Sequence, residues 1–145
     1  MADIDYTAAK VSPVYPTKAE IFPHIAIEAI TAGQVVYFDA TTGKCGIADG
    51  DVAAKDQARG IALQTVGAGQ AVDVIQRGHV YGFTLTNQSY EDLLYLSDTA
   101  GDMCDEAAGS TSGSVVGRVV ALSDAALTKV VFVDIAFHTE WTKGD

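Results

Sequence analysis

Three histidines are the side chains best suited to acid–base or metal-ligand chemistry, because imidazole titrates near neutral pH. They are His24, His79 and His138. Only His138 has further potential ligands close by, since Glu140 would share its face of a strand and Asp134 lies just before it. Zinc sites need three or four ligands with supporting groups behind them. We therefore expect no metal site at these histidines.

Two acidic turns and one glycine-rich turn are the remaining candidates for binding an ion or a cofactor. Residues 98–106 hold four acidic side chains, and Asp49, Asp51 and Asp56 form a smaller group. Neither has the regular spacing of a calcium loop, so both are expected to be solvated turns. Residues 67–69, Gly-Ala-Gly, begin like a dinucleotide-binding loop, but the third glycine is missing and a strand is expected to follow. We expect no cofactor.

Nucleophilic catalysis would need a cysteine or serine activated by a neighbouring base. Cys45 and Cys104 have no histidine near them in the sequence, and both are expected to be small buried strand residues. Two isolated cysteines fit a chain made in a reducing cytosol, although the sequence leaves their pairing open. The serine-rich stretch 109–114 is expected to be a surface loop. The sequence thus favours a structural or binding protein over an enzyme.

Composition excludes several classes of protein. The chain has 145 residues, a net charge of −10 and 48% hydrophobic residues, so it is too apolar for a disordered acidic tail and long enough for one domain with a core. Its cations are too few and too scattered for nucleic acid, because phosphate contacts need clustered Lys and Arg. No apolar stretch approaches the ~20 residues needed to cross a membrane, and no Sec-type secretion signal is visible. We expect no nucleic-acid or membrane partner.

Short β-like runs separated by Gly, Asp and Asn occupy the chain from residue 25 onward. The clearest lies at 129–137, where Val131 and Val133 fall on one face and Asp134 on the other. No segment has the sustained 3.6-residue period of a helix, although 49–57 and 123–127 could each hold one turn. The expected strands are 25–30, 34–39, 44–48, 59–66, 71–76, 79–85, 93–97, 115–122 and 129–137.

The two halves of the chain resemble each other. Residues 32–36, Ala-Gly-Gln-Val-Val, recur as Ala-Gly-Gln-Ala-Val at 68–72. A longer similarity links 36–45 with 94–104, where a strand is followed by an Asp, a turn with Gly, and a Cys six residues after the Asp. Two similar β modules that close on each other predict a small all-β barrel or sandwich.

Residues 1–24 differ from the domain expected at 25–145, because they contain all three prolines and no glycine. They are expected to form an extended arm that either folds back along its own domain or lies across a neighbouring molecule. The sequence leaves both open. Trp141, beyond the last expected strand, is either a plug for the core or an interface anchor. The arm residues expected to contact a partner are Tyr6, Pro13, Val14, Tyr15, Pro16, Ile21 and Phe22.

A series of short motifs runs through residues 31–80. Thr-Ala-Gly-Gln-Val-Val-Tyr-Phe-Asp at 31–39 is followed by Gly-Ile-Ala-Leu at 60–63, Ala-Gly-Gln-Ala-Val-Asp-Val at 68–74 and Gly-His-Val at 78–80. In this order and spacing the chain resembles the capsid decoration, or head cement, proteins of tailed bacteriophages, with a weaker similarity through residue 137.

The resemblance implies a compact β-tulip-like domain that assembles as a homotrimer on the exterior of the phage head. There it would bind the major capsid protein and cement neighbouring subunits against the internal pressure of the DNA, without any chemistry. An extended N-terminal segment that orders against the shell would correspond to the arm. The alternatives are a tail, baseplate or head-fibre attachment component, or a carbohydrate-binding β module. Against the last, the aromatic residues are scattered along the sequence.

Overall fold

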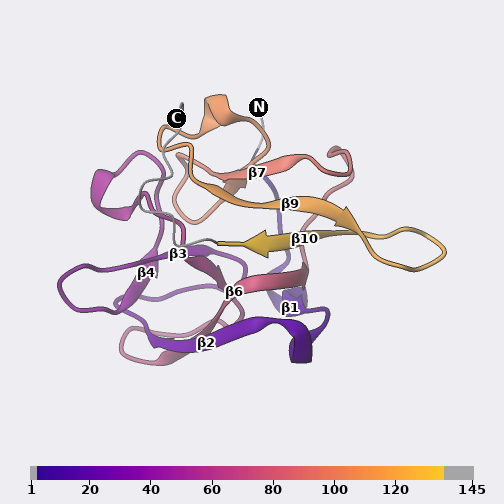
Figure 1. Ribbon diagram of the computed structural model, residues 1–145. Helices are drawn as coiled ribbons and strands as arrows, with labels where there is room; N and C mark the ends of the chain where they lie inside the picture. The colour runs from indigo at the N-terminus through magenta and orange to yellow at the C-terminus, as the bar shows by residue number, and fades with distance from the viewer. Residues whose placement is uncertain (1–2, 136–145) are drawn as a thin grey trace.

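The protein is all-β, and one antiparallel sheet curls into a half-barrel (Figure 1). The computed structural model describes residues 3–135. Its helices are single 3₁₀ turns: η1 (Ala8–Lys10), η2 (Pro16–Lys18), η3 (Ala53–Lys55) and η4 (Ala107–Gly109). The strands are β1 (Ser12–Pro13), β2 (Glu20–Ile25), β3 (Val35–Phe38), β4 (Cys45–Ile47), β5 (Gly60–Ala62), β6 (Ala71–Tyr81), β7 (Leu93–Leu96), β8 (Met103–Cys104), β9 (Val115–Ala121) and β10 (Lys129–Asp134).

The two halves of the chain build the same arrangement in turn. In each half, two strands form a hairpin, a third strand adds to the first strand of that hairpin, and a fourth pairs with the third. The two fourth strands, β6 and β10, pair with each other. The resulting strand order is β4-β3-β5-β6-β10-β9-β7-β8, which confirms the two similar modules expected from the sequence.

The long strand β6 lies at the centre of the sheet. Its first half pairs with β2 and β5, and its second half pairs with β1 and β10. The sequence predicted two strands here, because Arg77-Gly78 is typical of a turn. The strand instead continues through Gly78, whose positive φ of 142° allows it to bend there.

Two hydrophobic clusters lie on opposite faces of the sheet. The main core, inside the curl, includes Val35, Ile61 and Ile75 together with residues of β7, β9 and β10. Their strand neighbours, such as Val36 and Ala62, belong to a smaller cluster on the other face, because successive side chains of a strand alternate. Burying one such aliphatic side chain completely stabilises the fold by roughly 1.5–3 kcal/mol.

The N-terminal arm folds back along its own domain in this single chain. β1 and β2 both pair antiparallel with β6, and Figure 1 shows β2 running along the edge of the sheet. The Ile4 N–H donates to the Met103 carbonyl at 2.8 Å, so the arm also contacts the strand at the end of the sheet order. Ile4 and Val11 are 3% and 7% exposed and belong to the main core. The arm is therefore part of the folded domain.

Two glycines let the arm approach the body closely. A Cβ on Gly33 would lie 2.5 Å from the Tyr6 ring, and one on Gly82 would lie 2.7 Å from the Val11 Cα. Both glycines have positive φ, a conformation that other residues rarely adopt. Any side chain at these positions would therefore push the arm away from the sheet.

The strand expected at 25–30 is wrong, because the strand there is Glu20–Ile25. Pro23 suggested an irregular segment, but an edge strand tolerates a proline. The structure gives 49–57 one 3₁₀ turn, η3, and gives no helix at 123–127. The expected strand at 129–137 ends at Asp134, and residues beyond 135 lie outside the described chain.

Candidate partner-binding surface

Two of the arm residues expected to contact a partner pack against the chain's own core. The centroid of the Tyr6 ring lies 5.9 Å from that of Phe83, and Tyr6 is packed against the main core. Burial, and secondarily the charge of Asp102, raises the pKa of Tyr6. Ile21 is also partly buried against this core. In the isolated chain, both side chains therefore stabilise the fold.

The other five arm residues are accessible to different degrees. Pro13 and Val14 are half-buried beside β6, whereas Pro16 is exposed. Tyr15 and Phe22 are 41% and 51% exposed, so two large apolar side chains of the arm are accessible to a partner. The arm thus presents one aromatic ring before η2 and another on β2.

Tyr15 stands at the end of a row of rings on the outer face of the sheet, here called the aromatic strip: Tyr15, His79 and Phe132. The Tyr15 and His79 rings meet edge to face with centroids 5.3 Å apart, and the His79 and Phe132 centroids are 4.9 Å apart. His79 and Phe132 are directly paired across β6 and β10. Aromatic contacts of this kind are worth about 0.5–1.5 kcal/mol each, so they hold Tyr15 in place.

A shallow open hollow of about 360 Å³ lies beside the aromatic strip. Lys18, Glu20 and Arg77 line it together with the three rings. Arg77 also lies 3.9 Å from Asp134 in an ion pair whose side chains are more than half exposed, so this pair contributes little to stability. A partner would therefore meet aromatic rings framed by charges of both signs.

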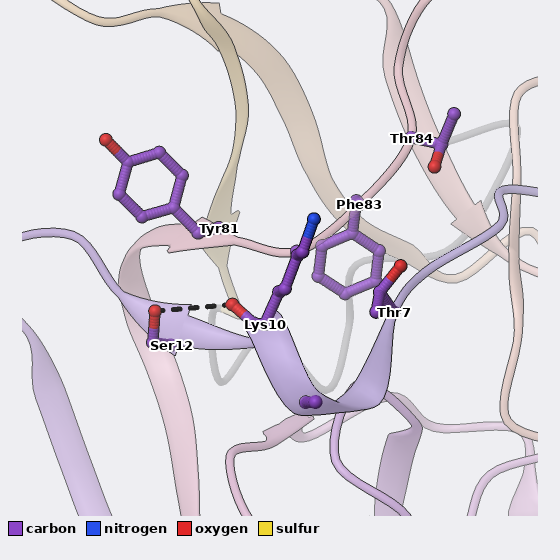
Figure 2. Close-up of a pocket in the computed structure, with 8 residues that line it drawn as sticks. Thr7, Lys10, Ser12, Tyr81, Phe83 and Thr84 are labelled. Carbon is purple, nitrogen blue, oxygen red and sulfur yellow. Dashed lines mark hydrogen bonds between the residues drawn. The ribbon is translucent and has the colours of Figure 1, made fainter.

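A second hollow, of about 490 Å³, lies between the arm and the end of β6 (Figure 2). Its hydroxyl groups come from both sides, with Thr7 and Ser12 on the arm and Tyr81 at the end of β6. Lys10 is the one charged residue in its lining, and Figure 2 shows its side chain extending between the Tyr81 and Phe83 rings. This polar hollow continues the accessible surface along the arm.

Phe22 has exposed aliphatic neighbours that extend the apolar surface beyond the aromatic strip. Ile25 and Ile27 are 42% and 39% exposed. Within the described chain β2 pairs along its length only with β6, which leaves its other edge open. An open edge strand is a template for an added strand, and Pro23 weakens that template by removing one N–H donor. We call Phe22, Ile25 and Ile27 the β2 edge patch.

The two histidines in the described chain serve as packing groups. Burial lowers the pKa of both His24 and His79, so both are neutral at pH 7. The His24 ring lies 4.3 Å from that of Phe38, and its buried Nε2 has no hydrogen-bond partner among the described residues. Within residues 3–135, no three His, Cys, Asp or Glu side chains are grouped as a metal site would need. His138 and Glu140 lie outside the described residues.

Both cysteines are free and fully buried on the second strand of their hairpins, as the sequence predicted for small strand residues. Burial raises the pKa of the Cys45 and Cys104 thiols, which makes them poor nucleophiles. The loop at 109–114 is less exposed than expected, since Ser110 is 2% exposed. Asp98 accepts hydrogen bonds from the Thr111 N–H and O–H, so the acidic turn fastens this loop to the body.

The aromatic strip and the β2 edge patch are the features that the sequence did not reveal. The strip joins an arm residue to two strands that are distant in sequence, so rings that are scattered along the sequence meet in space. Part of the strip could have been found from the sequence, because side chains alternate along β6 and β10 and this alternation places His79 and Phe132 on the outer face. Trp141 lies outside the described residues.

Comparisons with family models, with curated proteins and with solved structures find no match to this chain. Among the described residues, no helix is long and apolar enough to span a membrane.

Proposed function

We propose that the protein is a structural component that decorates the exterior of a bacteriophage capsid and cements neighbouring major capsid subunits. The observation that carries this proposal is the arm, which is anchored in the core by Ile4 and Val11 yet presents Tyr15 and Phe22 to solvent. An anchored arm loses little entropy when its exposed side chains bind a partner, because it is already ordered. The resemblance of the motifs at 31–80 to head cement proteins supports the same assignment.

The mechanism is physical and needs no reaction. The aromatic strip and the β2 edge patch would be covered by the capsid surface, and the open edge of β2 could accept a strand from a capsid loop. Burying the exposed part of Tyr15 or Phe22 contributes on the order of 1 kcal/mol for each side chain. A homotrimer would engage three such surfaces at once, so its second and third contacts become intramolecular. Separating two capsid subunits would then require breaking several contacts together.

The test is binding to undecorated heads of the phage that carries this chain. We expect Tyr15→Ala and Phe22→Ala each to weaken binding by about tenfold or more, because each removes a central apolar contact. Tyr90→Ala is the matched control, since Tyr90 is 45% exposed but lies outside the strip and the patch. Cosedimentation with heads and cryo-electron microscopy of the decorated particle measure the effect. Wild-type protein that fails to bind heads, or variants that bind as tightly as the wild type, would contradict the proposal.

A second candidate function is carbohydrate binding, which the aromatic strip favours. Sugar rings stack on exposed aromatic side chains, and here Tyr15, His79 and Phe132 border a hollow with hydrogen-bonding groups at Lys18 and Arg77. A glycan array separates the two functions. Binding that is lost in Tyr15→Ala and retained in Tyr90→Ala would support a carbohydrate-binding module, and an array without any signal would remove this candidate.

A further inference from the structure

The start of the arm meets the β7–β8 hairpin along a narrow contact, here called the arm seam: residues 3–6 and 102–104. Asp3 forms an isolated bridge with Cys104, and the Ile4 N–H donates to the Met103 carbonyl at 2.8 Å. On the other side, the Thr84 N–H donates to the Asp5 carbonyl at 2.8 Å. The seam therefore joins the hairpin to the segment after β6, with Ile4 covered beneath it.

Three carboxylates crowd this seam. Asp3 accepts a hydrogen bond of 2.6 Å from the hydroxyl of Ser97, which is itself 2% exposed, so Asp3 is held against the hairpin. Asp5 is the neighbouring acid on the arm, and Asp102 faces both from the hairpin turn. No Lys or Arg of the described chain forms an ion pair with any of the three. Within residues 3–135, no cation therefore offsets the repulsion between their charges.

The surroundings of Asp102 disfavour its ionised form. Burial, with the charges of Asp3 and Asp5 in addition, raises its pKa to about 6 from an ordinary 3.8. The other titratable groups that face this cluster from the arm and the hairpin are also acidic, so none favours the ionised carboxylate: Tyr6, Asp98, Cys104 and Asp105.

The direction of the pH effect follows from this shift. Asp102 binds its proton more tightly when the arm is docked, because detaching the arm removes Asp3 and Asp5 and lets water in. Docking is therefore most favourable below about pH 4 and weakens as the pH rises to about 6, above which no further loss is expected.

We propose that the arm seam is a proton-dependent latch, which is held most tightly when Asp102 is protonated and opens more often when Asp102 is ionised. The pairing of β1 and β2 with β6 contains none of these three carboxylates, so it stays intact when the latch opens. Opening frees residues 3–6, uncovers Ile4 and exposes the backbone edge of β8. The latch is a property of the chain alone and does not depend on the proposed function.

Amide hydrogen exchange of the full-length protein between pH 4 and pH 8 tests the latch. After correction for the intrinsic exchange rate, the protection of the Ile4 amide should fall between about tenfold and a hundredfold over this range, as a pKa shift of this size implies. The protection of β10 amides should stay constant. Equal protection of Ile4 at both ends of the range, or a parallel loss throughout β10, overturns the proposal.

Variants separate the latch from a general effect of charge. Asp102→Asn should keep the Ile4 amide at its acid-state protection up to pH 8. Asp134→Asn makes the same change in net charge at an exposed site on β10 and should retain the wild-type pH dependence. If Asp102→Asn does not fold, the exposed Asp5→Asn replaces it. Removing the Asp5 charge lowers the pKa of Asp102 in the docked state, so the total loss of Ile4 protection should be smaller and should end at a lower pH than in the wild type. A variant at either position that opens as the wild type does would refute the latch.

Discussion

Single residues decide how closely the arm lies on the sheet. Gly82 has a φ of 110° and allows no room for a Cβ, because the Val11 backbone lies within 2.8 Å of the place where that Cβ would stand. Gly69 has a similar φ of 84°, but a Cβ there would meet nothing within 4 Å. Comparing substitutions at Gly82 and Gly69 therefore separates the cost of a positive φ from the cost of losing the close contact with Val11.

We predict that Gly82→Ala destabilises the fold clearly more than Gly69→Ala. Both variants carry the cost of positive φ, about 1 kcal/mol, but only Gly82→Ala must also displace Val11 from the main core, which adds about 1–3 kcal/mol. Urea unfolding of both variants measures the difference in the free energy of unfolding. Equal values for the two variants would show that the arm does not depend on this contact.

The strands of the arm are part of the sheet, and two of its side chains are part of the core. The arm supplies β1, β2 and two core side chains, Ile4 and Val11, so it cannot be treated as an appendage of a separate body. Deleting it would remove the proposed contact residues and a part of the core together.

We predict that deletion of residues 1–22 abolishes cooperative unfolding or lowers the free energy of unfolding by about 4 kcal/mol or more, because Ile4, Val11 and the β1 pairing are lost. The double variant Tyr15→Ala, Phe22→Ala keeps these anchors and should remain within about 2 kcal/mol of the wild type. Thermal denaturation followed by circular dichroism distinguishes the outcomes. A truncated chain that unfolds with wild-type cooperativity would mean that the arm is dispensable for the fold.

The position of many strands could be predicted from the sequence, whereas the pairing of the strands and the limits of β2 and β6 could not. Local runs of apolar residues identified β3, β4, β7 and β9 within one residue at each end, and they identified the start of β10. They failed at β6, where Gly78 permits a bend inside one strand, and at β2, where Pro23 lies on an open edge. In both cases a residue that usually ends a strand is accommodated by its tertiary surroundings.

At the scale of the whole molecule, the internal repeat predicted two similar modules, and the strand order confirms them. The candidate site was less accessible to prediction. Tyr15 was selected from the arm, but its neighbours His79 and Phe132 come from different modules, and only the pairing of β6 with β10 brings them together. Contacts between residues so far apart in sequence have no local signal.

The bridge between Asp3 and Cys104 also constrains how the chain reaches its native state. Asp3 needs a partner that is synthesised about a hundred residues later, so a growing chain cannot complete this contact until most of it has left the ribosome. Until then Ile4, Tyr6 and Val11 remain uncovered, and an emerging arm could pair with another nascent copy. Folding of this protein is therefore expected to be slow for its size and sensitive to the local concentration of unfinished chains.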